Sequence, residues 1–339
     1  MAVTPENSDL GSVSLKVNKA QTVPQQMINF ASRFTVQIAL LLLVIAFSLL
    51  SDRFLQIENW SNIIQQSSII AVSAIGATFV IITAGIDLSV GSVVALSGIL
   101  SAGVIVNSGF PAWAGLLVGL LVGLLVGLFN GLSITRLGLS AFIATLATLA
   151  MARGLTLAYS NGQTIFGLPT GYTFLGSGDL FGISFPVIIT ALMFIIGHIV
   201  LSRTVFGHQV YAIGGNREAA RLAGINVRRI ELLVYLLAGG LSGLAGLILT
   251  GRLTAALPSS ATGLELDVIA SVVIGGASLF GGRGSLIGTL FGVLTIGVLR
   301  NGLNLLNVSP FWVQFVQGAV IFLAVLIDAL GQRQRRANA

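Results

Sequence analysis

The chain is dominated by long apolar stretches, each about the length that a helix needs to cross a lipid bilayer. An α-helix needs about 20 predominantly apolar residues for this. Ten such stretches alternate with short polar loops, which predicts an all-α integral membrane protein with about ten transmembrane helices. The third and eighth begin with acidic, glycine-containing motifs, so either can enter the membrane as a broken or partly unwound segment. The predicted spans are residues 31–51, 63–84, 88–107, 112–134, 139–160, 182–202, 229–251, 265–281, 284–304 and 309–330.

The polar residues exclude several other classes of protein. Only 8% of the 339 residues are charged, whereas soluble domains carry about 25%. The net charge of +6 comes from short loops between apolar stretches, so we expect lipid rather than nucleic acid around this chain. The absence of cysteine and the presence of only two histidines argue against a metal site. The only lysines are Lys16 and Lys19, so no phosphate-binding P-loop can form, and we expect no cofactor in this chain.

The distribution of basic residues predicts the orientation. With ten spans and the N-terminus in the cytoplasm, 13 of the 17 Lys and Arg residues fall on the cytoplasmic side, as the positive-inside rule requires. Residues 1–30 are then expected to form a disordered cytoplasmic tail, and residues 331–339 a basic cytoplasmic tail. The other four basic residues, which we place outside or near the outer ends of spans, are Arg53, Arg153, Arg252 and Arg300.

One polar stretch, residues 203–231, concentrates charge between two apolar spans. It holds seven of the 28 charged residues, five of them arginines. Gly214-Gly215-Asn216 is a turn signal; Asn216 can cap a short helix of about two turns through Ala223, and Gly224 supplies a stop. A solvated loop that obeys the positive-inside rule explains the charges alone. The capped helix instead favours a docking site for a cytosolic partner.

The two halves of the chain resemble each other. The motif around Asp87 and Ser89 that opens the third span matches the motif around Glu265 and Asp267 that opens the eighth, and Asn130-Gly131-Leu132 matches Asn301-Gly302-Leu303. These matches predict repeat blocks at about residues 63–160 and 229–330. Corresponding spans are five apart, so the blocks have opposite orientations, as in transporters with inverted repeats.

Small residues and acids in the spans leave two alternatives open. Glycines at every fourth position, such as Gly119, Gly123 and Gly127, allow helices to approach closely, either within the chain or at a homodimer seam. A carboxylate in a span costs about 2.5–3.5 kcal/mol on insertion scales, so an acid there must have a role. Asp87, Glu265 and Asp267 either cap helix N-termini or line a path for a polar solute.

Four ordered motifs resemble those of a known family. They are GIDLSVGS (85–92), AIGGNREAARLAGINV (212–227), GLELDVIASVVIGGASLFGGRG (263–284) and NGLNLLNVSPF (301–311). Together they resemble the ribose-type sugar permeases of bacterial ABC importers, over about residues 35–330. The resemblance implies the membrane subunit of an importer in the bacterial inner membrane, with ribose or a related pentose or hexose as the solute. The competing hypothesis is a stand-alone secondary carrier or channel for a small polar solute.

The resemblance also implies partners and site residues. The partners are a second copy of the chain, a cytosolic ABC ATPase that holds ATP and Mg, and a periplasmic sugar-binding protein. The implied ATPase-coupling residues lie in the cytoplasmic loop 203–230 and are Gly214, Gly215, Asn216, Arg217, Glu218, Ala220, Arg221 and Gly224. The candidates for the pathway or gate are Asp87, Ser89, Asn130, Glu265, Asp267 and Asn301. The candidates for contacts with the binding protein are Arg53, Arg252 and Arg300. No residue is expected to be catalytic.

Overall fold

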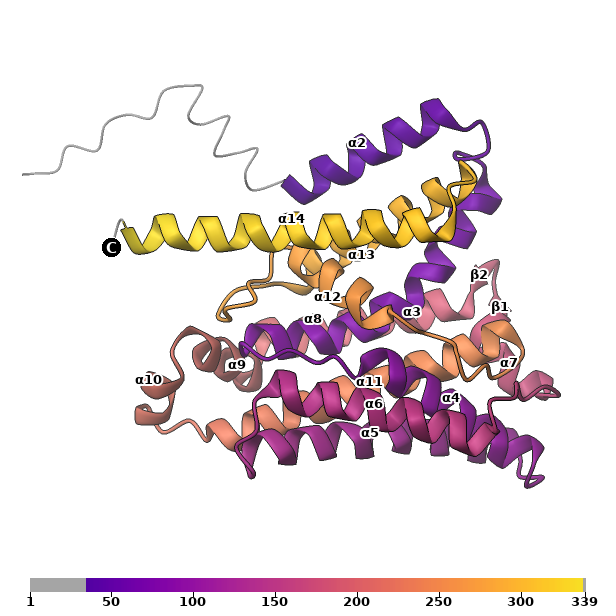
Figure 1. The fold of residues 1–339 in the computed structure, drawn as a ribbon, viewed down its shortest axis with the longest axis horizontal. Helices are drawn as coiled ribbons and strands as arrows, with labels where there is room; N and C mark the ends of the chain where they lie inside the picture. The colour runs from indigo at the N-terminus through magenta and orange to yellow at the C-terminus, as the bar shows by residue number, and fades with distance from the viewer. Residues whose placement is uncertain (1–34, 338–339) are drawn as a thin grey trace, which may run out of the picture.

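The computed structural model describes residues 35–337, so the predicted tail 1–30 lies outside the described residues. This part of the chain is almost entirely helical (Figure 1). The elements are α2 Thr35–Leu50, α3 Ile57–Ile82, α4 Val90–Val106, α5 Ala112–Thr135, α6 Ala141–Ser160, α7 Thr170–Ser177, β1 Asp179–Leu180, β2 Ile183–Ser184, α8 Phe185–Arg203, α9 Val205–Gly215, α10 Arg217–Leu222, α11 Val227–Leu253, α12 Leu264–Ile274, α13 Leu286–Leu305 and α14 Pro310–Ala337.

Each of the ten predicted spans contains a helix, in the order α2, α3, α4, α5, α6, α8, α11, α12, α13 and α14. Among the described residues, six helices are long and apolar enough to cross a membrane: α3, α5, α6, α8, α11 and α13. Shorter apolar helices cover 35–50, 90–106 and 310–323. These findings confirm an all-α membrane protein. The helix α14 continues to Ala337, beyond the predicted boundary at residue 330.

The eighth predicted span, residues 265–281, is wrong in its C-terminal part. The helix α12 has 11 residues, which at 1.5 Å per residue span about 16 Å, roughly half of the hydrocarbon core. The chain leaves the helix at Gly275, and Gly276 then has a φ of +92°, which only glycine adopts without strain. A loop therefore runs from residue 275 to 285. The third span is intact from Val90, after an irregular segment that contains Asp87.

The glycines of α5 pack against another helix of the same chain and do not lie on a free surface that could form a homodimer interface. A Cβ added at Gly123 would lie 2.8 Å from Cα of Gly243 on α11 and would also collide with the carbonyl oxygen of Gly239. A Cβ at Gly127 would lie 3.1 Å from Cα of Gly239. The spacing of four residues on both helices lets the two backbones touch, which confirms the intrachain alternative.

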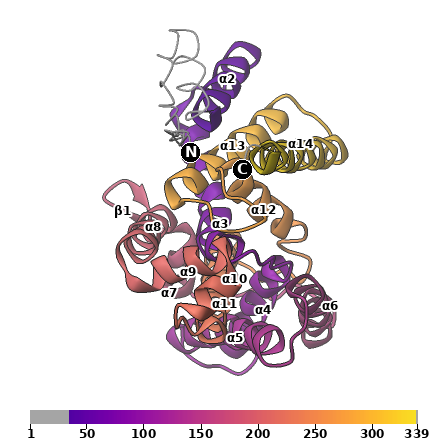
Figure 2. The same cartoon turned by 90° about the vertical axis from the view of Figure 1, so that its left-hand side faces the viewer.

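The long helices divide the molecule into two groups. Viewed end-on in Figure 2, α4, α5 and α6 lie on one side and α12, α13 and α14 on the other, with α3 between them. These groups do not coincide with the predicted repeat blocks, because α11, which belongs to the second block, packs against α4 and α5 of the first. The repeat itself stays a prediction. Figure 1 shows α9, α10 and the C-terminal end of α14 at one end of the molecule. The unpredicted helix α7 and the β1–β2 hairpin lie at the opposite end.

Candidate functional site

The short helix α10 is built as the sequence predicts. The Asn216 side chain caps it by accepting a hydrogen bond of 3.0 Å from the backbone N–H of Ala219. The helix runs from Arg217 to Leu222, and Gly224, with a φ of +84°, reverses the chain. Asn226 then caps α11 through the N–H of Arg229, at 3.1 Å. The chain therefore presents one rigid, capped turn between α9 and α11.

Gly214 and Gly215 do not form the predicted turn, because they are the last two residues of α9. The direction of the chain changes at Asn216 alone, where the backbone is extended. A Cβ at Gly214 would collide with the carbonyl oxygen of Ile82, the last residue of α3. Glycine is therefore needed at position 214 because α9 packs closely against the end of α3, and not because the chain turns there.

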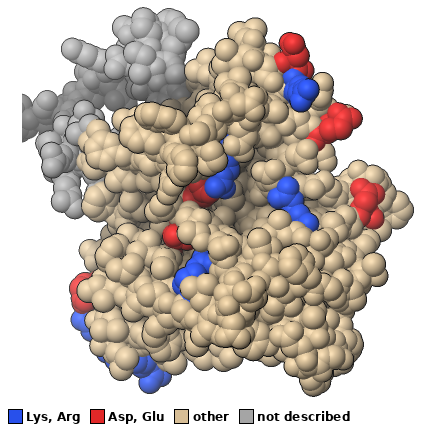
Figure 3. All heavy atoms as spheres, turned by 45° about the vertical axis from the view of Figure 1, so that its right-hand side comes forward, with Lys and Arg blue, Asp and Glu red and all other residues tan. Residues whose placement is uncertain are grey.

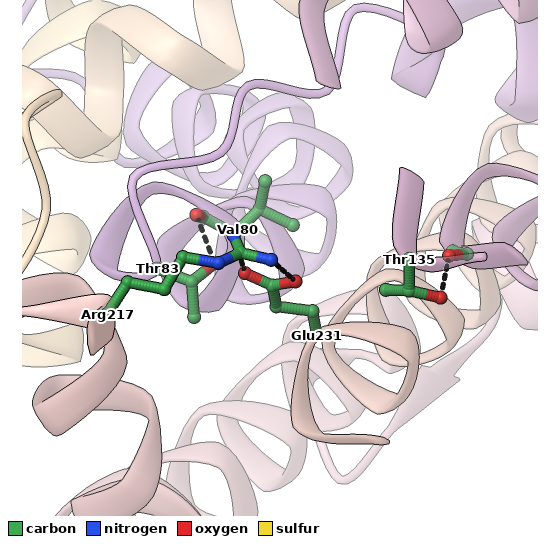
Figure 4. A network of polar contacts seen from close by, with 6 residues as sticks. Val80, Thr83, Thr135, Arg217 and Glu231 are labelled. Atoms are coloured by element: carbon green, nitrogen blue, oxygen red, sulfur yellow. Dashed lines mark hydrogen bonds and ion pairs between the residues drawn. The ribbon is translucent and has the colours of Figure 1, made fainter. Parts of the chain in front are cut away.

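Arg217 anchors α10 to α11 through an ion pair that the sequence does not reveal. Its Nη1 and Nη2 atoms donate to Oε1 and Oε2 of Glu231, at 2.5 and 2.9 Å (Figure 4). The Glu231 side chain is only 5% exposed, whereas that of Arg217 is 57% exposed. Figure 4 shows the pair beside the end of α3, where Thr83 Oγ1 donates to the carbonyl oxygen of Val80 at 2.8 Å. The parallel two-bond geometry fixes the guanidinium in one orientation.

The other predicted coupling residues divide into exposed and buried ones. Glu218 and Arg221 form an exposed pair on the outer face of α10, with a distance of 3.0 Å between Arg221 Nε and Glu218 Oε2. Leu222 beside them is 78% exposed. Ala220 points the other way and is buried in the core, so it holds the helix in place and offers no surface to a partner. The exposed residues of α10 and its cap therefore include Asn216, Arg217, Glu218, Arg221 and Leu222, and their role in docking stays a prediction.

A second group of predicted residues forms a buried chain of hydrogen bonds before α4. Asp87 Oδ1 accepts from the backbone N–H of Ser89 at 2.8 Å and from its hydroxyl at 2.6 Å. Asn130 Nδ2 on α5 donates to Ser89 Oγ at 3.0 Å, and Thr148 Oγ1 on α6 donates to Asn130 Oδ1 at 2.6 Å. Asp87 thus bonds to the residue that precedes α4 and not to the N–H groups of the first helical turn, so the predicted capping bond is not formed. The chain of bonds ties α4, α5 and α6 together.

The buried hydroxyl of Tyr235 lies between the hydrogen-bond chain that starts at Asp87 and the Arg217–Glu231 ion pair. Tyr235 is one turn from Glu231 on α11, it is 2% exposed, and its hydroxyl has no hydrogen-bond partner among the described residues. A Cβ at Gly85 would lie 2.5 Å from that hydroxyl, which places the ring beside the segment that leads to Asp87. Side chains of one face of α11 therefore connect α10 with the irregular segment before α4.

A cavity of about 220 Å³ lies between α3, α11, α12 and α13. In the space-filling view, acidic and basic side chains lie around a hollow in the middle of the face, and the other charged side chains in view lie near its edges (Figure 3). Arg300 Nη1 donates to Asp267 Oδ2 at 2.9 Å in the cavity wall, and Asp267 is buried. Apolar side chains of α3, α11 and α12 complete the walls. The polar lining residues are Gln66, Ser67, Arg252, Thr262, Asp267 and Arg300.

The cavity unites residues to which the sequence gives separate roles. Asp267 is a predicted pathway residue, and Arg252 and Arg300 are predicted contacts of a binding protein. Arg300 is engaged by Asp267 within the chain, while Arg252 has no ion pair among the described residues. Gln66 and Ser67 were missed, although two glutamines and two serines at residues 65–68 interrupt an apolar span and are a detectable signal.

The remaining candidates lie elsewhere. Asn301 exchanges two amide hydrogen bonds with Asn59, at 2.9 and 3.0 Å, and joins the end of α13 to the start of α3. The carboxylate of Glu265 lies beside Gly91, at the start of α4. Arg53 is exposed in the turn between α2 and α3. Asp87, Ser89, Asn130, Glu265 and Asn301 are not among the residues that line the cavity.

Comparison with known proteins gives consistent matches over most of the chain. Residues 59–325 match the family described as the branched-chain amino acid transport system / permease component. The ribose import permease protein RbsC of Bacillus subtilis is 52% identical over 293 residues, 86% of this chain and 91% of that protein. RbsC of Escherichia coli K12 is 44% identical (86% and 92% covered), and the L-arabinose transport system permease protein AraH of the same strain is 38% identical (87% and 89%). No solved structure matches the chain.

Proposed function

Because the chain belongs to the branched-chain amino acid transport system / permease component family, and within it to the sugar permeases of ABC importers, we propose that it is the membrane-spanning subunit of a ribose importer. The observation that carries the choice of ribose is the 52% identity to a protein named as a ribose import permease, over 91% of that protein's length. The relatives named for D-allose and L-arabinose are more distant, at 36% and 38% identity.

ATP hydrolysis on a partner chain supplies the energy for transport in this proposal. The sequence contains no P-loop lysine, so ATP and Mg are held by a cytosolic ATPase. The exposed face of α10, with Glu218, Arg221 and Leu222, is the surface where that ATPase docks. A displacement of α10 passes to α11 through the Arg217–Glu231 pair, since a two-bond ion pair and a capped helix resist bending. Two copies of the chain enclose the sugar pathway.

A periplasmic binding protein delivers the sugar at the opposite end of the molecule, where the turn that carries Arg53 is exposed. The N- and C-termini lie on the cytoplasmic side, together with α10. Because the binding protein supplies the affinity, the permease needs only a weak contact with the sugar in each of its two states.

The experiment is reconstitution in proteoliposomes with an ABC ATPase and a periplasmic sugar-binding protein from the same organism. Uptake of labelled D-ribose should require ATP, the ATPase and the binding protein, and L-leucine should not be taken up. Uptake of ribose by the permease alone would identify a stand-alone carrier. ATP-dependent uptake of leucine but not of ribose would show that the transported solute is an amino acid and not a sugar.

A further inference from the structure

We propose that the loop of residues 275–285, between α12 and α13, is a second link through which a displacement of α10 reaches the membrane helices. It acts beside the Arg217–Glu231 pair, which joins α10 to α11. The proposal rests on the proposed function, because it takes α10 as the surface on which the ATPase acts. It assigns a positioning role to two residues of α9, Tyr211 and Gly214.

Three segments of the chain meet backbone to backbone at the C-terminal end of α9. They are the end of α3, the last turn of α9 and the loop 275–285. A Cβ added at Gly214 would collide with the carbonyl oxygen of Ile82 on α3 and would lie 2.5 Å from the nitrogen of Gly282 in the loop. A Cβ added at Gly282 would lie 3.0 Å from Cα of Gly215. No side chain separates these backbones, so a change in the position of one segment displaces the others.

Two hydrogen bonds hold the loop to the helices. The backbone N–H of Gly282 donates to the carbonyl oxygen of Ile82 at 2.8 Å. From α9, the Tyr211 hydroxyl donates to the carbonyl oxygen of Gly284 at 2.7 Å. Packing alone resists only a push, whereas a hydrogen bond also resists separation. The loop therefore follows α9 in both directions of movement.

The loop also has internal bonds that keep it from absorbing such a movement. The N–H of Ser278 donates to the carbonyl oxygen of Arg283 at 3.0 Å, and the N–H of Gly281 donates to that of Ser278 at 2.9 Å. Ser285 caps α13 by accepting from the N–H of Gly288 at 3.0 Å. The loop is thus a closed turn between two helix ends, and its displacement passes to α12 and α13.

The two links lead to different groups of helices. The Arg217–Glu231 pair leads to α11, which packs against α4 and α5. The loop leads to α12 and α13, on the other side of α3 in the end-on view of Figure 2. In Figure 1 the loop that follows α12 extends toward the end of the molecule where α9 and α10 lie. Because only Asn216 separates α9 from α10, one movement of α10 acts on both groups, and loss of either link leaves one group uncoupled.

The test measures ribose imported per ATP hydrolysed by the complete transporter, with its ATPase and binding protein, in proteoliposomes. Tyr211→Phe removes the hydrogen bond to the loop and keeps the ring. Gly214→Ala forces the three backbones apart. The matched controls lie on α6: Tyr159→Phe, whose hydroxyl is beside Gly103 of α4, and Gly154→Ala, where an added Cβ meets nothing within 4 Å.

We expect the ribose imported per ATP to fall about five-fold in Tyr211→Phe, the factor that corresponds to one hydrogen bond of ordinary strength. It should fall further in Gly214→Ala and stay unchanged in both controls. A purely structural role would lower uptake and hydrolysis together, because less transporter would be folded, and would leave their ratio unchanged.

An unchanged ratio in Tyr211→Phe would overturn the second link, even if Gly214→Ala does not fold. An equal fall in Tyr159→Phe would overturn it as well, because that hydroxyl does not touch the loop. Absence of ATP-dependent ribose uptake by the unaltered transporter would instead refute the proposed function.

Discussion

The ion pair between Arg217 and Glu231 gives the sharpest quantitative prediction, because one partner is buried and the other is not. Breaking a fully buried pair costs about 3–5 kcal/mol, whereas exposed pairs contribute about 0–1 kcal/mol. With side-chain exposures of 5% for Glu231 and 57% for Arg217, we expect Arg217→Ala to cost about 2 kcal/mol of local stability. This cost corresponds to an increase of about 30-fold in the population in which α10 is undocked.

Hydrogen exchange of the purified permease measures this population directly. The amides of Ala220, Ala223 and Ile225 donate within and just after α10, so their protection reports its local unfolding. Arg217→Ala should lower that protection by about 30-fold, whereas Arg221→Ala removes only an exposed pair and should change it by about two-fold. Exchange in Arg217→Ala that matches the unaltered protein would refute the anchoring role and leave Arg217 as a contact for the ATPase alone.

A double mutant separates the buried charge from the lost contact. In Arg217→Ala/Glu231→Gln no charge remains buried, so protection of α10 should recover most of the loss seen in Arg217→Ala alone. Additive losses in the double mutant would contradict the assignment of the cost to the uncompensated Glu231 carboxylate.

Three further predictions follow from buried contacts elsewhere. Asn130→Leu removes the buried hydrogen bonds to Ser89 and Thr148, each worth about 0.5–1.5 kcal/mol, and should destabilise the permease by about 1–3 kcal/mol, measured as a lower thermal unfolding midpoint by size-exclusion chromatography. Gly123→Leu should abolish the α5–α11 contact and the yield of folded protein, whereas Gly154→Ala, where an added Cβ meets nothing within 4 Å, should be neutral or stabilising by up to about 1 kcal/mol. Tyr235→Phe removes a hydroxyl that has no partner within residues 35–337, so it should leave the unfolding midpoint unchanged or raise it, and a drop of several degrees would contradict this.

The elements that the sequence predicts well are those set by short-range chemistry. Apolar length locates the helices, and the spacing of glycines on α5 predicts its close contact with another helix. Asn216 and Gly224 define α10 to within one residue, because a capping side chain and a left-handed glycine act on their immediate neighbours.

The features that sequence reasoning missed depend on contacts between distant segments. The sequence predicts Gly214 as a turn residue. The structure shows instead that any larger side chain there would collide with the carbonyl oxygen of Ile82, more than one hundred positions away. The sequence predicts Arg217 as a coupling residue, which stays a prediction, but it does not reveal the ion pair of Arg217 with Glu231. The cavity joins α3, α11, α12 and α13, so its polar residues could be found singly from the sequence but not grouped.

The central claim is that α10 and the cavity respond to each other through α11, and one measurement tests it most directly. The rate at which a charged thiosulfonate reagent labels Gln66→Cys, an exposed position in the cavity wall of this cysteine-free chain, is compared between the nucleotide-free transporter and the transporter trapped with ATP, with either Arg217 or Arg217→Ala. The account predicts a rate that changes with nucleotide when Arg217 is present and a much smaller change in Arg217→Ala. A rate that is insensitive to nucleotide in both, or equally sensitive in both, would contradict it.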